Sequence, residues 1–208
     1  MRKILAFLLS CTLLCSITAC AKEEPLSELD AIQKALLEME GYSCTATLSR
    51  TVDGNTKTYE IAQHYKSTGE YRLELTAPEA VAGNYTIFDG SRICQYNPKL
   101  DSSIIRNAAS SQHRNELFLG QFLSNYLQSE GVSVEAAALE DSRCILLEAV
   151  IPGKNTSLST EKLWVDRESL LPVRLSIFDT KGQECYRIDY KTFTFNPQFE
   201  PTLFAITE

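Results

Sequence analysis

The 208-residue sequence has only two histidines and one tryptophan, and it lacks the short motifs that mark common enzymes. It contains no Gly-x-Ser-x-Gly elbow, no His-Glu-x-x-His helix, no phosphate-binding glycine loop and no dinucleotide fingerprint. Neither His64 nor His113 has a cysteine, aspartate or serine at a spacing that would build a catalytic or metal site. We therefore expect no catalytic residue, no metal and no cofactor, and we expect that the protein is not an enzyme.

Positive charge is also scarce. The chain has 20 lysines and arginines against 27 aspartates and glutamates, with a formal net charge of -7 and no basic stripe. Proteins that bind the phosphate backbone need such a stripe, so nucleic acid is not an expected partner. The same deficit means that attachment to anionic lipid cannot rest on charge, and a membrane-bound form would need an acyl anchor.

A hydrophobic run long enough to span a membrane is missing as well. The apolar run from Ile4 to about Ile17 follows Arg2 and Lys3, and it is shorter than the roughly 20 residues of a spanning helix. A basic start, an apolar run and small residues at its end are the three parts of an export signal. The run ends at Ile17-Thr18-Ala19-Cys20, which resembles the bacterial lipobox.

In a lipobox the cysteine becomes the new N-terminus and carries a diacylglycerol thioether. Cys11 is a poorer candidate because the apolar run before it is too short, and Cys15 is poorer because bulky Leu14 precedes it. We expect a signal peptide over residues 1–19, a lipidated tether over residues 20–27 and one domain over residues 28–208. The lipid at Cys20 would hold the protein on the extracytoplasmic face of a bacterial cell membrane.

Cysteine pairs at metal or redox spacing are absent from the rest of the chain. The four further cysteines lie far apart in sequence, which disfavours a zinc knuckle and thioredoxin-like chemistry. Export permits oxidation, so two disulfides in any of three connectivities stay open, but the apolar strand-like contexts favour buried thiols. These cysteines are Cys44, Cys94, Cys144 and Cys185.

The remaining pattern is that of strands with two helices. Ser27 and Asp30 approximate a capping box, and apolar residues recur at helical spacing until Gly41. From Tyr42 to Arg106 the period is two, with hairpin turns between the apolar runs, which predicts a β-meander. Further strands are expected at residues 132–139, 144–151, 161–165, 172–178 and 184–195.

A second helix is predicted from Gln112 to Glu130, because apolar residues again recur at helical spacing there. Its stripe includes Phe118, Phe122 and Tyr126. Such a stripe usually packs in a core, but the same side chains would also form the wall of an apolar ligand cavity, so these three residues are the candidate cavity lining. Trp164 is expected to anchor the core.

These elements predict an α+β fold, in which a large curved antiparallel β-sheet forms an incomplete barrel packed on two or three helices. The spacing of whole segments resembles the LolA-like family of lipoprotein carriers over nearly the whole mature chain. The first half of the resemblance lies in Gly69-Glu70-Tyr71-Arg72-Leu73-Glu74-Leu75, Pro78-Glu79, Phe88-Asp89-Gly90 and Tyr96-Asn97-Pro98-Lys99-Leu100. The second half lies in Leu163-Trp164-Val165-Asp166, Leu171-Pro172-Val173-Arg174-Leu175, Asp179 to Gly182 and Asn196-Pro197. The resemblance implies a barrel closed by helices, often around an apolar cavity.

The LolA-like carriers are soluble and unlipidated, whereas Cys20 would tether this chain, and Lys66-Ser67 stands where the carriers have a basic residue followed by proline. A lipidated, acidic chain with a short tether is more similar to the germination lipoproteins of spore-forming clostridia, the GerS type. That resemblance implies a noncatalytic, forespore-associated partner that binds and activates a peptidoglycan amidase needed for spore cortex modification.

Two hypotheses follow. In the first, the protein binds a partner protein through exposed strand edges or the convex sheet face. In the second, it is a carrier or sensor that holds a lipid or acyl chain in its cavity. A homodimer formed by exchange of hairpins is left open. A hydrolytic role would need carboxylates brought together from distant strands, and the acidic residues fall mostly at turns and on polar faces.

Overall fold

The computed structural model describes residues 27–108, 114–130, 133–140, 142–153 and 157–207. The predicted signal peptide, Cys20 and His113 lie outside these residues.

The first element is α1 (Glu28–Leu37), at whose start the Ser27 hydroxyl accepts a hydrogen bond from the backbone N–H of Asp30 at 3.2 Å. This contact satisfies one of the free N–H groups of the first turn, as the capping pattern predicted.

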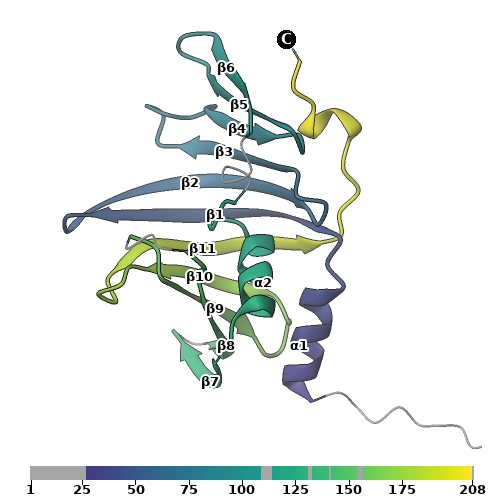
Figure 1. Ribbon diagram of the computed structural model, residues 1–208, viewed down its shortest axis with the longest axis vertical. Coiled ribbons are helices and arrows are strands. Elements are labelled where there is room, and N and C mark those ends of the chain that lie inside the picture. Colours follow the sequence, from purple (N-terminus) through teal and green to yellow (C-terminus); the bar gives the residue numbers. More distant parts are fainter. Residues whose placement is uncertain (1–26, 109–113, 131–132, 141, 154–156, 208) are drawn as a thin grey trace, which may run out of the picture.

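Within the described residues, one sheet of eleven strands makes up most of the molecule (Figure 1). Every pair of neighbouring strands is antiparallel. The strands are β1 (Gly41–Val52), β2 (Asn55–Lys66), β3 (Tyr71–Ala77), β4 (Tyr85–Phe88), β5 (Arg92–Asn97), β6 (Ser102–Asn107), β7 (Ser133–Leu139), β8 (Ser142–Val150), β9 (Thr160–Asp166), β10 (Pro172–Phe178) and β11 (Glu184–Phe195).

The order of the strands across the sheet is β6-β5-β4-β3-β2-β1-β11-β10-β9-β8-β7. The first and last strands therefore meet in the middle, and β6 and β7 form two free edges. The chain passes from one edge to the other through α2 (Leu119–Gln128), which crosses in front of the sheet (Figure 1). The predicted α+β class, with a large antiparallel sheet in an incomplete barrel, is confirmed.

The hairpin between β1 and β2 shows how turn residues set the register. Asp53 and Gly54 both have positive φ, 50° and 76°, as a two-residue turn with the twist of the flanking strands requires. Val52 then pairs with Asn55, and the ladder runs on to Gly41 opposite Lys66. The meander predicted from Tyr42 to Arg106 is confirmed.

The second helix begins later than predicted. Residues 114–118 are not helical, and α2 starts at Leu119. The Asn115 side chain accepts a hydrogen bond from the Leu117 N–H at 3.2 Å, and the Leu117 carbonyl accepts one from Gln63 Nε2 of β2 at 2.9 Å. These contacts hold the segment against the sheet in an irregular conformation, so tertiary structure overrides the helical spacing.

The core lies between the helices and one face of the sheet. Alternate residues of the strands point into it, and the residues between them point away. In β9, Leu163 and Val165 are fully buried, whereas Trp164 between them is half-buried on the opposite face. The expectation that Trp164 anchors the core is therefore wrong, since the strand period places it outward.

The end of the chain packs on the opposite face of the sheet. After β11 it forms a 3-10 helix, η2 (Pro201–Phe204), and Ile206 then packs against Ile87 and Cys94. Ile87 precedes Phe88, which belongs to the main core, so these neighbours in β4 point to opposite faces. The C-terminal segment that follows η2 therefore covers the convex side of β4 and β5.

Cys44, Cys94 and Cys144 are buried free thiols, and Cys185 is a half-buried free thiol. Burial raises the pKa of Cys44 to about 12, so this thiol is uncharged at neutral pH. The preference for buried thiols over disulfides agrees with this arrangement, except that Cys185 is the least covered. No helix in the described part of the chain has the length and apolar character to cross a membrane.

Candidate functional site

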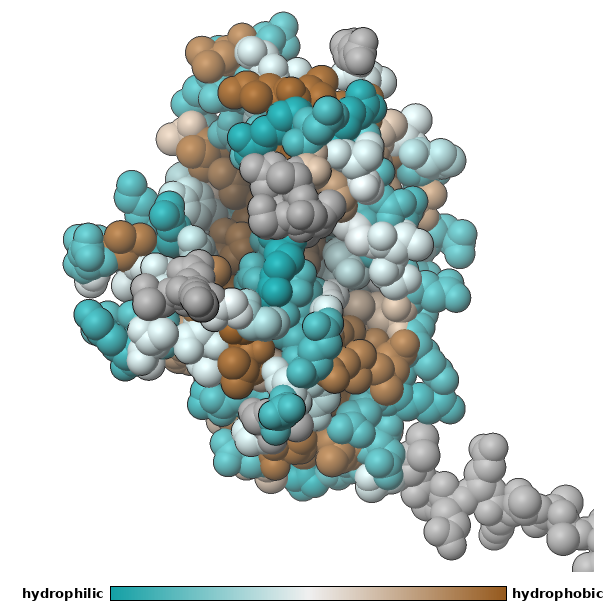
Figure 2. Space-filling view, viewed as in Figure 1, coloured by the Kyte–Doolittle hydropathy of each residue, from teal (hydrophilic) through white to brown (hydrophobic). Residues whose placement is uncertain are grey.

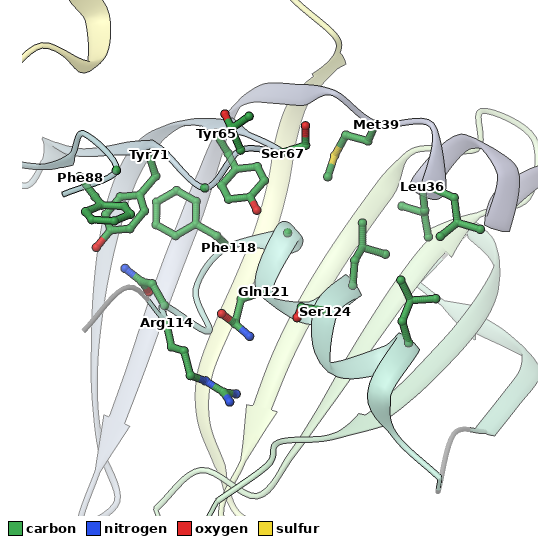
Figure 3. Close-up of a pocket in the computed structure, with 18 of the residues that line it drawn as sticks. Leu36, Met39, Tyr65, Ser67, Tyr71, Phe88, Arg114, Phe118, Gln121 and Ser124 are labelled. Atoms are coloured by element: carbon green, nitrogen blue, oxygen red, sulfur yellow. The ribbon is translucent and has the colours of Figure 1, made fainter. Parts of the chain in front are cut away.

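A groove of about 630 Å³ opens between the end of α1, the tip of the β2–β3 hairpin and the outer side of α2. Figure 3 shows Tyr65, Tyr71, Phe88 and Phe118 at one end of this groove, and Leu36 and Met39 at the other. The residues that line it are Leu36, Leu37, Met39, Tyr65, Ser67, Thr68, Gly69, Tyr71, Phe88, Gly90, Arg114, Asn115, Phe118, Gly120, Gln121, Leu123, Ser124, Leu127 and Gln128.

The aromatic end is a continuous cluster of four rings in tilted contact. The ring centroid of Phe118 lies 6.0 Å from that of Tyr65 and 4.6 Å from that of Tyr71, and Tyr71 lies 5.5 Å from Phe88. Tyr71, Phe88 and Phe118 are buried, so they form a rigid floor and present little surface of their own.

Gly120 allows this floor to meet α2. A Cβ atom at position 120 would lie 2.0 Å from Cζ of Tyr65, far inside van der Waals contact. The absence of a side chain therefore lets the Tyr65 ring lie directly on the first turn of the helix.

The groove is apolar at its rim and carries little charge. Leu37 is 59% exposed and Leu127 is 63% exposed, while Arg114 is the one charged residue among the described residues that line it. The Arg114 guanidinium is already engaged. Its Nη2 donates one hydrogen bond to Glu116 Oε1 and one to Asn125 Oδ1, each at 3.0 Å. The surface that remains suits an apolar occupant.

The three predicted lining residues lie in different places. Phe118 lines the groove, whereas Phe122 is fully buried in the main core and is not part of the groove wall. Tyr126 packs against the core, and its hydroxyl accepts a hydrogen bond from Gln33 Nε2 of α1 at 3.3 Å. The residues of the same helix that line the groove are Gly120, Gln121, Leu123, Ser124, Leu127 and Gln128.

Below α2, neutral polar groups anchor its first turn to the sheet. The Tyr42 hydroxyl accepts from the Leu119 N–H at 3.2 Å and donates to Gln63 Oε1 at 3.0 Å. Gln63 also donates to the Leu117 carbonyl and is fully buried. This anchor takes the place of a side-chain cap, which α2 lacks at Phe118.

The middle of α2 is anchored by a carboxyl group. Asn125 donates from Nδ2 to Oε1 of Glu161 at 2.6 Å, and both side chains are buried, with exposed fractions of 1% and 0%. Asn125 Oδ1 accepts from Arg114 and from Gln121 Nε2. Among the described residues, Glu161 Oε2 has no hydrogen-bond partner.

Burial raises the pKa of Glu161 to about 7, because the charged form loses its hydration. The hydrogen bond from Asn125 lowers the pKa, the nearby charge of Glu116 raises it and that of Arg114 lowers it. The carboxyl group therefore titrates near neutral pH rather than near 4.5. No cluster of metal-ligating side chains surrounds it in the residues that are described.

The free edge at β6 offers a different kind of surface. Leu100 is 73% exposed and Ile104 is 64% exposed, beside a hollow of about 390 Å³ that is also lined by Leu73 and Leu75. Figure 2 shows apolar surface at the top of the view, over β5 and β6. The backbone groups on the outer side of an edge strand are unpaired, so this region can add a strand from another chain.

The family described as "Sporulation protein YdcC-like" matches residues 1–204, and the chain belongs to it. A curated relative, "Sporulation protein YdcC" of Bacillus subtilis (strain 168), is 18% identical over 188 residues. The match covers 90% of this chain and 55% of that relative, so the chain spans little more than half of the curated relative's length.

Two solved structures share the fold. An uncharacterized conserved protein from Thermus thermophilus is 13% identical, with a TM-score of 0.54 over 87% of this chain and 93% of that one. A chain in the structure of the CwlD amidase from Clostridioides difficile in complex with the GerS lipoprotein is 27% identical, with a TM-score of 0.50. That match covers 84% of this chain and 99% of the other. The predicted similarity to the GerS type is confirmed by this match, and the incomplete barrel that the resemblance implied is the observed fold.

Gln63, Asn125 and Glu161 are buried polar residues that were not predicted from the sequence. A signal for Glu161 was present, because it alternates with Leu163 and Val165 and so belongs to the core face of β9. Gln63 likewise alternates with Ile61 and Tyr65 in β2. Asn125 follows Phe122 by three residues and Leu119 by six, so helical spacing places all three on the same side of α2, which is the buried side.

Proposed function

We propose that this protein is a noncatalytic lipoprotein, held on the extracytoplasmic face of the membrane by a lipid at Cys20, that binds a partner protein during sporulation. The observation that carries the proposal is the 27% identity, over 84% of the chain, to a chain from the complex of the CwlD amidase with the GerS lipoprotein. Membership of the sporulation-related family supports the same setting. We further propose that the partner is a cell-wall amidase, which this protein activates for spore cortex modification and germination.

The sheet provides a physical basis for such binding. An open sheet has two edges whose backbone donors and acceptors can pair with a strand of a partner. At β6 the exposed Ile104 and the hollow beside it would add apolar contacts to those backbone hydrogen bonds. At β7 the large hydrophobic residue that is exposed is Val134, with 37% of its surface accessible.

The test is affinity capture of the full-length, detergent-solubilised lipoprotein from sporulating cells, with the bound proteins identified by mass spectrometry. We expect an amidase at stoichiometric amount, and addition of the lipoprotein should raise the activity of the purified amidase. Recovery of no amidase, and no effect on amidase activity, would contradict the proposal.

Matched variants distinguish the two edges. Ile104→Lys places a charge on β6, and Val134→Lys places the same charge on β7. If β6 binds the partner, the first variant should lose capture by tenfold or more and the second should retain it. Equal retention by both variants would exclude both edges as the binding surface.

The lipid anchor has its own test. Cys20→Ala should move the protein from the membrane fraction to the soluble fraction and abolish incorporation of labelled palmitate. A variant that stays with the membrane and still incorporates label would show that Cys20 is not the lipidated residue.

A second function, binding of a lipid or acyl chain, is favoured by one observation: the groove of about 630 Å³ with Phe118 in its floor and leucines at its rim. Extraction of the purified protein followed by lipid mass spectrometry should then recover acyl lipid beyond that attached to Cys20. Leu123→Asp, in the groove wall, should reduce this lipid, whereas an unchanged yield would exclude the groove.

A further inference from the structure

Glu161 is an unusual residue to find beneath a helix. It projects from β9 into the core, it is fully buried, and its hydrogen bond to Asn125 ties it to the middle of α2. Its neighbours in the sheet are Ala149 of β8 and Ile177 of β10, which offer no charge and no polar side chain. Only one of its two carboxylate oxygens has a partner among the described residues.

The energetics of this site depend on a proton. A neutral carboxyl group with one hydrogen bond is tolerable in a core, but an ionised one without a paired cation is costly. The cation nearest to it in this network is Arg114, which reaches Asn125 rather than Glu161 and is also bound to Glu116. The negative charge of Glu116 opposes the benefit that Arg114 would bring.

We propose that α2 is a proton-controlled cover on the concave face of the sheet: it stays docked while Glu161 is protonated and lifts from the sheet when Glu161 ionises. Lifting carries Asn125 away and lets water reach the carboxylate. It also breaks the contact of Ser129 with Val150 of β8, where the Ser129 hydroxyl accepts from the Val150 N–H at 3.1 Å.

Titratable and charged groups face Glu161 both from α2 and the segment before it and from the sheet. On the helix side these are Asn125, Arg114 and Glu116, and on the sheet side the electrostatic neighbour is Tyr190 of β11, with Cys44 of β1 next to it. Burial raises the pKa of Tyr190 and of Cys44, so both stay neutral around pH 7. Arg114 and Glu116 are paired with each other, since Nη2 of Arg114 lies 3.0 Å from Oε1 of Glu116.

The first turn of α2 would remain attached. Its anchors, Tyr42 and Gln63, are uncharged and hydrogen-bonded to each other and to the backbone, so a change of pH around 7 leaves them unaffected. The movement is therefore a swing about Leu119. Because Leu123, Ser124 and Leu127 of α2 form one wall of the groove, the same movement would widen the groove and expose the core face beneath it.

Hydrogen exchange of the full-length lipoprotein in detergent micelles tests the proposal, with exchange times corrected for the intrinsic effect of pH. The pKa of Glu161 is about 7 while α2 is docked, and its ordinary value in water is 4.5. Opening of the helix therefore becomes more favourable as the pH rises. The opening constant of the amides of α2 should rise roughly 30-fold between about pH 5.5 and about pH 8. The amides of β1 and β2 serve as an internal reference and should not follow α2.

Glu161→Gln should remove this dependence, so that α2 stays protected at both pH values. Glu148→Gln is the matched control, because Glu148 lies on the other face of β8, where its carboxylate is 3.1 Å from Lys162 Nζ, and it should keep the dependence of the unmodified protein. An unmodified protein in which α2 is equally protected at both pH values overturns the proposal, as does a Glu161→Gln variant with an unchanged pH dependence. Loss of protection in α2, β1 and β2 together would show global unfolding and would also overturn it.

Discussion

The sheet has two halves that differ in whether helices cover their concave face. In the covered half, formed by β8 to β11 and β1, the face packs against α1 and α2, and Leu147, Leu163, Leu175 and Ile188 are fully buried. In the open half, formed by β3 to β6 and their connections, Leu100 and Ile104 are mostly exposed, and no helix in the described residues lies in front of β5 and β6 (Figure 1). The backbone of the two halves is the same antiparallel ladder.

This difference indicates a division of roles. Apolar burial stabilises a fold in proportion to the area removed from water, so the covered half supplies most of the stability. The open half contributes less to folding and leaves apolar surface available, which is the property of a binding surface. The predictions that follow compare the halves through single substitutions.

The largest effect is expected in the covered half. Leu163→Ala removes a fully buried side chain between β8, β10 and the helices, and it should lower the free energy of unfolding by about 2–5 kcal/mol. Leu73→Ala in β3 of the open half removes a partly buried side chain and should cost about 1 kcal/mol. Urea denaturation of both variants measures the difference, and equal losses would contradict the division of roles.

The buried carboxyl group of the covered half should make stability depend on pH. The folded state binds the proton of Glu161 more tightly than the unfolded state does, because the pKa is about 7 against 4.5. The free energy of unfolding should therefore fall as the pH rises from about 4.5 to about 7 and stay level above that range.

Glu161→Gln removes this loss. At about pH 8 it should stabilise the protein by up to roughly 3 kcal/mol, and near about pH 4.5 it should have little effect. Denaturation curves for the variant and the unmodified protein at both pH values provide the measurement. Destabilisation by Glu161→Gln at the higher pH would show that the ionised carboxylate is compensated in the fold.

Much of this architecture could be predicted from the sequence because its signals are local. The alternation of Tyr71-Arg72-Leu73-Glu74-Leu75 and the Asp53-Gly54 turn specify strands and a hairpin without reference to the rest of the chain. The start of α2 could not be predicted, because the contact that holds Leu117 outside the helix comes from Gln63, 54 residues away.

The groove was only partly predictable for the same reason. The stripe that contains Phe118 is visible in the sequence, but the side of α2 that faces the groove depends on where α1 and the β2–β3 hairpin lie. Phe122 and Tyr126 belong to the same stripe and face the core instead. The alternation of β9 indicates that Glu161 lies on the core face of the strand. Carboxylates are rarely buried, however, so its residue type alone predicts a surface position.

The smallest effect on stability is expected at the edge of the open half. Ile104 is 64% exposed, so Ile104→Lys buries no charge and leaves no cavity, and it should change the free energy of unfolding by no more than about 0.5 kcal/mol. The same urea experiment measures it beside Ile93→Lys in the neighbouring strand, where a side chain that is 5% exposed is replaced by a charge and a loss of several kcal/mol is expected. A large loss for Ile104→Lys would mean that β6 is covered in the free protein, and the capture of partners at this edge would then need another explanation.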